Sequence, residues 1–102
     1  MNVDEAIELI KKERQRQVSY EGWSPEHDDL HDKGELAMAA ACYAAPEQVY
    51  TVKVRNDFYG FHDAWPWDKG WDKRDKHDRQ KQLVIAGALV IAELERLSRI
   101  KD

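Results

Sequence analysis

A run of ten residues, from Leu83 to Ala92, is apolar or small at every position. No other part of the sequence restricts the fold as strongly. With its flanking residues it predicts a long helix from about Asp75 to Ile100, and a helix that is apolar on all sides must be covered on all sides. A chain of 102 residues forms one domain around one core. We therefore expect a second subunit to cover part of this helix, in a homo-oligomer that is a dimer or a tetramer.

The N-terminal segment predicts an amphipathic helix from about residue 3 to residue 18. Val3, Ile7 and Ile10 recur at helical spacing and share one face. Either Asn2 or Asp4 can cap the start of this helix through a side-chain oxygen.

The second helix along the chain is predicted to begin at Ser24-Pro25, because Ser is favoured at the N-cap and Pro at the first helical position. It should run from Pro25 to about Ala45 and end at Pro46. Residues 49 to 54 suit either a short strand or an irregular helix extension. The rest of the region from Pro46 to about His77 is predicted to be a long loop, which in a small domain is usually functional.

Together these elements predict an all-α domain spanning residues 1–102, a helical hairpin plus a long C-terminal helix in a bundle that oligomerises. The composition is 42% hydrophobic and 35% charged, which is too apolar for a disordered chain. The net charge of -4 argues against general nucleic-acid binding. The single cysteine, Cys42, fits a reducing compartment, and no apolar run is long enough for a membrane span. We expect a cytoplasmic protein without a membrane partner.

Five carboxylates lie within the ten residues from Glu26 to Glu35. On a continuous helix, Asp28, His31, Asp32 and Glu35 would fall within an arc of about 100°. This stripe leads into small core-type residues, so its acids need a positive partner. Mg²⁺ or Mn²⁺ fits best, because hard cations take oxygen ligands. The alternative is a solvated acidic turn that complements the helix dipole.

Arg14 and Gln17 continue the apolar face of the first helix. In a helical hairpin they would face Asp28, Asp32 and Glu35, where they could bind a nucleotide. A plain Arg–carboxylate tie between two helices is the alternative interpretation. His27 beside Asp28 also matches the His-Asp pair of helical metal phosphohydrolases, although only over two residues.

The predicted loop carries Trp65, Trp67 and Trp71 within seven residues. Aromatic rings stack on nucleobases, and Lys73 is one of several cations that could hold phosphates. We predict that Trp65, Trp67 and Lys73 bind a nucleotide. Large rings also serve as lids over a small core, and that interpretation stays open for each Trp.

Several short segments occur in an order that resembles a known family. They are Glu13-Arg14-Gln15-Arg16-Gln17, Glu21-Gly22-Trp23, Glu26-His27-Asp28-Asp29, Glu35-Leu36, Tyr43-Ala44, Trp65-Pro66-Trp67-Asp68 and Ala86-Gly87-Ala88-Leu89 through Ala92-Glu93-Leu94-Glu95-Arg96-Leu97. In this order they resemble the phage dATP/dGTP diphosphohydrolases, a MazZ-like group among the all-α MazG-like nucleoside triphosphate pyrophosphohydrolases. The resemblance covers the chain except for about residues 46 to 63.

The resemblance implies hydrolysis of a purine deoxynucleoside triphosphate to the monophosphate and pyrophosphate, in a phage or prophage protein within a bacterial host. It implies Mg²⁺ or Mn²⁺ held by carboxylates, and its acid pair at a spacing of three matches Asp32 and Glu35, the expected catalytic residues. It also implies an acid and a lysine where this chain has Gln82 and Ile85.

This departure leaves two alternatives to an enzyme. One is a non-catalytic nucleotide binder, such as a phage counter-defence protein that sequesters a nucleotide. The other is an acidic protein-interaction inhibitor, suggested by the acid cluster and the net charge.

Overall fold

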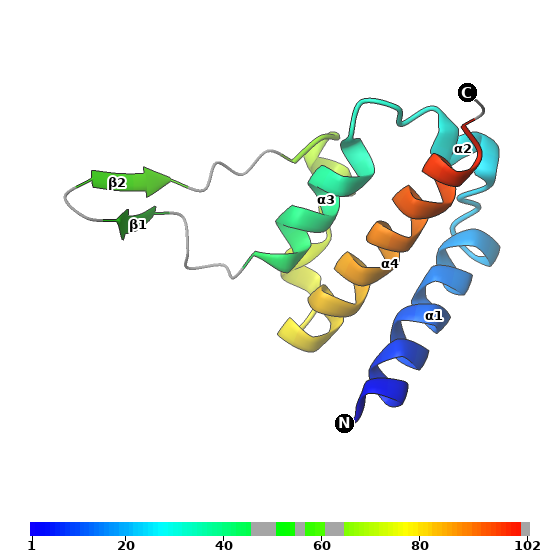
Figure 1. Ribbon diagram of the computed structural model, residues 1–102, viewed down its shortest axis with the longest axis horizontal. Coiled ribbons are helices and arrows are strands. Elements are labelled where there is room, and N and C mark those ends of the chain that lie inside the picture. The colour runs from blue at the N-terminus through cyan, green and yellow to red at the C-terminus, as the bar shows by residue number, and fades with distance from the viewer. Residues whose placement is uncertain (46–50, 55–56, 61–64, 101–102) are drawn as a thin grey trace.

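The computed structural model describes residues 1–45, 51–54, 57–60 and 65–100. Its main elements are the helices α1 (Val3–Ser19), α2 (Pro25–Asp29), α3 (Glu35–Ala44) and α4 (Arg79–Ser98) (Figure 1). The strands β1 (Thr51–Val54) and β2 (Asp57–Gly60) pair with each other, and two 3₁₀ turns, η1 (Lys69–Trp71) and η2 (Arg74–Lys76), precede α4. The helices make up the core, as the all-α prediction stated. No described helix is long and apolar enough to cross a bilayer.

The start of α1 follows from local capping. The Asn2 side chain accepts a hydrogen bond from the Glu5 backbone N–H at 2.8 Å, and the Glu5 side chain accepts one from the Asn2 N–H, which makes a capping box. The apolar stripe on this helix is less buried than its polar continuation. Val3 and Ile7 are 72% and 56% exposed, whereas Glu13, Arg14 and Gln17 are buried.

The predicted helix from Pro25 to Ala45 is wrong, because the structure divides it into α2 and α3. Ser24 caps α2 and Pro25 opens it as expected, but α2 ends after five residues. Gly34 then adopts a φ of +85°, in the left-handed region that favours glycine, and α3 begins after it. Residues 30 to 34 therefore form a connection between two short helices, and the acidic segment does not form one helical stripe.

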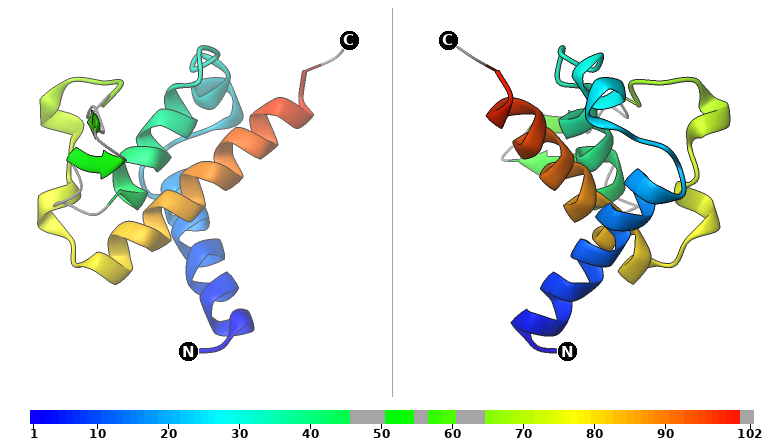
Figure 2. Two further views of the ribbon diagram at one scale, coloured as in Figure 1. Left: turned by 60° about the vertical axis from the view of Figure 1, so that its left-hand side comes forward. Right: turned by 90° about the vertical axis from the view of Figure 1, so that its right-hand side faces the viewer.

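The core forms where α3 packs on α4, and α1 crosses α4 from the other side (Figure 2). The buried hydrophobic cluster consists of Leu36, Ala39, Ala40 and Tyr43 from α3 with Ile85, Ala86, Leu89 and Ala92 from α4. A Cβ built at Gly87 would lie 2.8 Å from the Ile10 side chain, so glycine lets α1 approach α4 closely here. Small residues thus allow both α3 and α1 to pack closely on α4.

The C-terminal helix begins later than predicted, at Arg79 instead of about Asp75. Asp78 caps it by accepting a hydrogen bond from the Lys81 N–H at 2.8 Å. The 3₁₀ turn η2 takes up residues 74–76, so the α-helical pattern cannot extend back through them.

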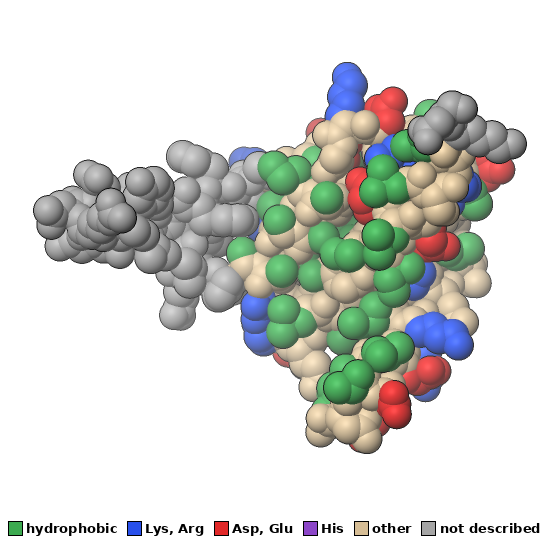
Figure 3. Space-filling model, in the orientation of Figure 1, with side chains coloured by type: hydrophobic (Ala, Val, Ile, Leu, Met, Phe, Trp, Pro, Cys, Tyr) green, Lys and Arg blue, Asp and Glu red, His purple; other side chains and the backbone are tan. Residues whose placement is uncertain are grey.

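One face of α4 is exposed within the single chain. Leu83, Val90, Leu94 and Leu97 are 47%, 48%, 61% and 50% exposed. Apolar side chains form a broad patch over α4 and its neighbours on this side of the molecule (Figure 3). The chain by itself does not cover this helix on all sides, and the predicted oligomer stays a prediction.

The predicted loop between Pro46 and His77 contains more regular structure than expected. The strands β1 and β2 form an antiparallel pair in which Thr51 faces Gly60 and Val54 faces Asp57, and they lie to one side of the helices (Figure 1). The strand β1 therefore has β2 as its partner, and β2 contains Phe58 and Tyr59, two residues of types that are favoured in strands. The first residues of the predicted strand, 49 and 50, lie outside the described residues.

Candidate functional site

Six aromatic side chains form a continuous series of ring contacts, which we call the aromatic row. Its members, in order, are Trp23, His27, His31, Trp67, Trp65 and Tyr43. Successive ring centroids lie 5.8, 5.0, 5.1, 5.5 and 5.9 Å apart, within the range of stacked and edge-to-face aromatic pairs. Three separate segments of the chain, residues 23–31, Tyr43 and residues 65–67, contribute to the row.

Local structure brings the first three rings together. Gly22 has a φ of +74° and turns the chain after α1, which places Trp23 just before α2. The Trp23 and His27 rings stack nearly parallel, at 13°. His31 follows His27 by four residues, just beyond the end of α2, and meets it edge to face.

The other end of the row is held by polar contacts. The Trp65 indole N–H donates to the Asp68 carbonyl at 3.2 Å. The Arg74 guanidinium lies over the Trp65 ring, 5.3 Å from its centroid, in a cation–π contact. Asp72 binds the same guanidinium at 2.6 Å, and this hydrogen bond is the main reason that the pKa of Asp72 is lowered.

A buried ion pair lies behind the aromatic row. The Asp28 carboxylate is fully buried, and its Oδ2 accepts a hydrogen bond from Arg14 Nη2 at 2.7 Å. Its Oδ1 lies 3.1 Å from His27 Nδ1, and Arg14 Nε donates to Glu95 at 2.7 Å. Asp28 thus connects α1 to α2 and fixes the orientation of the His27 ring.

The polar contacts continue along α1 to a second buried acid. Gln17 accepts from Arg14 and donates to Glu13, at 3.4 Å in both cases. Glu13 binds Arg16 and Lys81, each at 2.9 Å. Burial by itself would raise the pKa of Glu13, but these two cations outweigh it and the pKa is lowered. The hydrogen bonds that Arg16 donates to the Glu13 carboxylate in turn raise the pKa of Arg16.

Glu35 opens α3 beside the aromatic row. Its Oε1 accepts a hydrogen bond from the Lys33 N–H at 2.7 Å, and its Oε2 lies 3.4 Å from His31 Nδ1. Desolvation would raise the pKa of Glu35, but the hydrogen bonds from backbone N–H groups and the contact with His31 together lower it. Glu35 is therefore an ionised carboxylate next to aromatic rings.

The predicted metal ligands are not assembled into one cluster. Within the part of the chain that the structure describes, no three His, Cys, Asp or Glu side chains are placed to hold a metal ion. Asp28 is buried against Arg14, Asp32 is exposed on the connection between α2 and α3, and His31 and Glu35 contact each other. The break after Asp29 explains this, because the stripe was predicted for one continuous helix. The metal itself stays a prediction.

The residues predicted to bind a nucleotide fall into two groups. Trp65 and Trp67 lie together in the aromatic row, with exposed Lys73 next to Arg74. Arg14 and Gln17 lie inside the molecule instead, and there they hold Asp28 and Glu13. The structure therefore gives Arg14 the role of a tie between helices, which was the alternative interpretation.

Trp67 is the one described residue with a buried side-chain polar atom that lacks a hydrogen-bond partner among the described residues. An indole N–H left without an acceptor costs about 1–3 kcal/mol. Trp71, by contrast, is 65% exposed and takes no part in the described ring contacts. The two histidines, Trp23 and Tyr43 were absent from the sequence-based nucleotide site.

Gln82 and Ile85 both have structural roles. The Gln82 amide N–H donates to the backbone carbonyl of Arg74 at 2.9 Å, and its oxygen accepts from Arg79 at 3.4 Å. A carboxylate could not make the first of these bonds, since it has no N–H. Ile85 belongs to the hydrophobic core and is 6% exposed.

Comparison of the chain with protein families, with curated proteins and with solved structures found no match.

Proposed function

We propose that this protein binds a purine nucleoside triphosphate at the aromatic row and hydrolyses it to the monophosphate and pyrophosphate. The observation that supports the proposal is the continuity of the row together with the ionised carboxylate of Glu35, which contacts the third ring, His31. Half-buried Trp65 and Trp67 offer ring faces to a base, and stacking on such faces contributes about 1–3 kcal/mol per base. Glu35 lies beside the same row through its contact with His31.

The phosphates require cations, and the segment after the row supplies them. Lys73 is exposed, and Arg74 already lies over the Trp65 ring. A base stacked on Trp65 or Trp67 would place its phosphates within reach of one of these side chains. A planar guanidinium suits a phosphate because it can donate two parallel hydrogen bonds.

The divalent ion enters this proposal with the substrate. Mg²⁺ on a nucleotide is usually held by the phosphates, water and only one or two carboxylates, so a preassembled cage of three acids is not required. Glu35 and exposed Asp32 could supply these one or two carboxylates. The ion, Mg²⁺ or Mn²⁺, would neutralise charge on the phosphates.

The chain's own contribution to hydrolysis would be general-base assistance. A water molecule attacks a phosphorus, the bond to the departing pyrophosphate breaks, and a carboxylate accepts the proton that the water loses. Glu35 is our candidate for that base, because its ionised carboxylate lies beside the aromatic row through its contact with His31. Asp28 and Arg14 would act as positioning residues, since they fix His27 within the row.

The direct test measures pyrophosphate release from purine and pyrimidine dNTPs and NTPs, with Mg²⁺ and with Mn²⁺. Glu35→Gln removes the proposed base, and Glu26→Gln is the matched control, since Glu26 is an exposed acid on α2. We expect release from purine substrates that Glu35→Gln abolishes and Glu26→Gln preserves. Full activity of Glu35→Gln would exclude Glu35 as the base. No release from any substrate would exclude the hydrolase.

Binding without turnover is the second candidate function, and Gln82 favours it. In the resembled family an acid is implied there, whereas here the amide holds the backbone ahead of α4. Titration of dATP into the protein with Mn²⁺, followed by tryptophan fluorescence, separates the candidates. Tight binding with no pyrophosphate release supports sequestration of the nucleotide, and rapid turnover rules it out.

We also propose that the protein assembles as a homo-oligomer, a dimer or a tetramer, through the exposed face of α4. Leu83, Val90, Leu94 and Leu97 follow one another at spacings of seven, four and three residues. This heptad-like stripe can pack against its own copy around a two-fold axis. Light scattering of wild type and Leu94→Lys tests this, with a smaller particle expected for the variant. A wild-type mass of one chain would exclude the assembly.

A further inference from the structure

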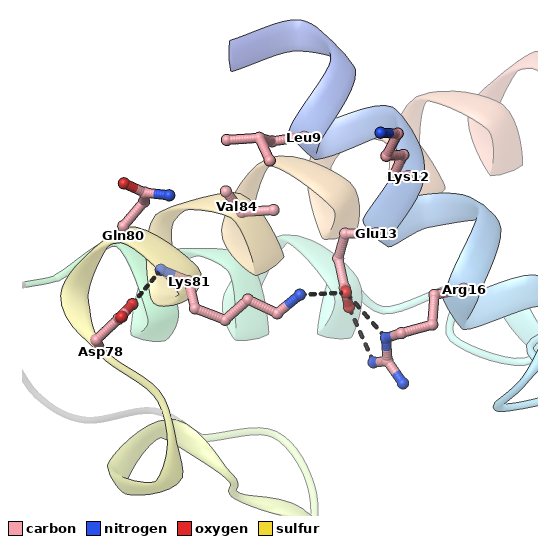
Figure 4. Close-up of a pocket in the computed structure, with 8 residues that line it drawn as sticks. All are labelled: Leu9, Lys12, Glu13, Arg16, Asp78, Gln80, Lys81 and Val84. Carbon is pink, nitrogen blue, oxygen red and sulfur yellow. Dashed lines mark hydrogen bonds and ion pairs between the residues drawn. The ribbon is translucent and has the colours of Figure 1, made fainter. Parts of the chain in front are cut away.

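A cavity of about 350 Å³ lies between α1 and the beginning of α4, lined by side chains that are not part of the aromatic row (Figure 4). Its lining residues are Leu9, Lys12, Glu13, Arg16, Asp78, Gln80, Lys81 and Val84. We propose that this cavity is a second binding site, specific for a multiply charged phosphate group. The proposal stands whether or not the aromatic row binds a nucleotide.

Two positively charged side chains contact the carboxylate of Glu13. Oε1 of Glu13 lies 2.9 Å from Arg16 Nε and 2.9 Å from Lys81 Nζ, so two cations meet at one oxygen. Figure 4 shows both of them reaching Glu13 from opposite sides, one from α1 and one from α4. A single carboxylate carries one negative charge and cannot balance two positive charges.

The carboxylate of Glu13 is itself inaccessible to solvent. Its side chain is 1% exposed, whereas those of Arg16 and Lys81 are 44% and 40% exposed. The buried acid therefore holds the two cations in place, and the cations, not the acid, face the solvent. An ammonium has three N–H donors, and Lys81 uses one of them on Glu13.

The remaining charges keep the lining positive. Lys12 has no ion pair among the described residues, and Asp78 accepts the Lys81 backbone N–H as the cap of α4. Arg16 also contacts Glu21, an exposed acid outside the lining, at 2.7 Å, and such exposed pairs are weak. The lining thus holds three positive and two negative side chains, in a protein whose net charge is -4.

The size and composition of the cavity suit a di- or polyphosphate. Small-molecule sites begin at about 300 Å³, which leaves room for more than one phosphate group. Charge-assisted hydrogen bonds from Lys and Arg to phosphate oxygens are among the stronger ones in proteins. The ligand could be free pyrophosphate or the phosphate chain of a nucleotide, with Leu9 and Val84 offering an apolar wall beside it.

The test is isothermal titration calorimetry of the whole protein with inorganic pyrophosphate, comparing Lys12→Met with Lys11→Met. Both substitutions remove one positive charge from exposed positions on α1, but only Lys12 lines the cavity. We expect pyrophosphate affinity to fall about tenfold in Lys12→Met, as for the loss of one charge-assisted hydrogen bond. Lys11→Met should match the wild type within about twofold, since screening weakens a distant charge.

Two further titrations identify the source of the phosphate. If dATP loses affinity in Lys12→Met and deoxyadenosine does not, the cavity holds the phosphates of a nucleotide. If only pyrophosphate is affected, it holds the free anion. Equal effects of Lys11→Met and Lys12→Met, or no pyrophosphate binding at all, overturn the proposal. The Trp65→Ala variant should still bind pyrophosphate, so failure of the aromatic row as a nucleotide site would be recognised separately.

Discussion

Arg14→Met tests the buried ion pair more directly than any other substitution. Arg14 and Asp28 lie 2.7 Å apart, with side-chain exposures of 9% and 0%. Removing the guanidinium leaves a carboxylate buried without its counter-charge, which costs about 3–5 kcal/mol. For a domain whose total stability is about 5–15 kcal/mol, this is a large fraction of the free energy of unfolding.

The assay is urea unfolding followed by circular dichroism at 222 nm. With a slope of about 2 kcal/mol per molar urea, a loss of 4 kcal/mol lowers the midpoint by about 2 M. Arg99→Met is the matched control, since Arg99 binds the neighbouring acid Asp29 at 2.8 Å on the exposed surface. We expect no measurable shift in the midpoint for that control, because exposed pairs contribute little.

A second substitution separates the buried charge from lost packing. Adding Asp28→Asn to Arg14→Met removes the unpaired charge while keeping the side-chain shape. The double variant should therefore recover part of the lost stability. If Arg14→Met costs no more than Arg99→Met, or if Asp28→Asn adds to the loss, the reasoning about the buried pair is refuted.

Three other substitutions probe the contacts that organise α1 and α4. Gly87→Ala places a Cβ 2.8 Å from the Ile10 side chain and should lower the free energy of unfolding by about 1–3 kcal/mol through overpacking, as measured by differential scanning calorimetry. Adding Ile10→Val to Gly87→Ala should restore part of this stability, and no recovery would contradict the contact. Gln82→Glu removes the N–H that binds the Arg74 carbonyl and should lower stability by about 1–3 kcal/mol in urea unfolding at neutral pH, so an unchanged midpoint would argue against its structural role. Because the folded-state pKa of Glu13 lies below its ordinary value of 4.5, the stability that Glu13 contributes is fully present above that pH and is lost as the pH falls through the folded-state pKa. Urea unfolding midpoints measured across pH 2–7 should therefore fall less steeply below about pH 4.5 in Glu13→Gln than in the wild type, and parallel curves would show that Glu13 does not titrate as inferred.

The sequence determined the elements whose ends are set by neighbouring residues. Ser24, and Asn2 as one of two candidates, were predicted as caps because a side-chain oxygen can bond to a backbone N–H within the next three residues, and both do so. The apolar segment in α4 was identified from its composition alone. Such features need no knowledge of distant residues, which explains why the first helix and the all-α class were predicted well.

The candidate site depended on the tertiary structure. Periodicity could not show that Gly34 takes a left-handed conformation and separates α3 from α2, and this break dispersed the predicted metal ligands. The aromatic row joins the segment from Trp23 to His31 with Trp67, which lies much later in the chain. Such contacts form only when separate segments pack together.

For the buried ion pair of Arg14 and Asp28, too, the sequence and the tertiary structure contributed different information. The sequence pattern placed Arg14 on the same helical face as Val3 and Ile7, and the structure buries Arg14 although Val3 and Ile7 are exposed. The sequence predicted that Arg14 faces Asp28, Asp32 and Glu35, and the tertiary structure shows which of these acids it binds, namely Asp28. The free energy of a charged side chain depends on whether a counter-charge reaches it in a region without water. The sequence therefore determined the all-α class and the starts of the first two helices, whereas only the tertiary structure decided which of the candidate acids pairs with Arg14 in the interior.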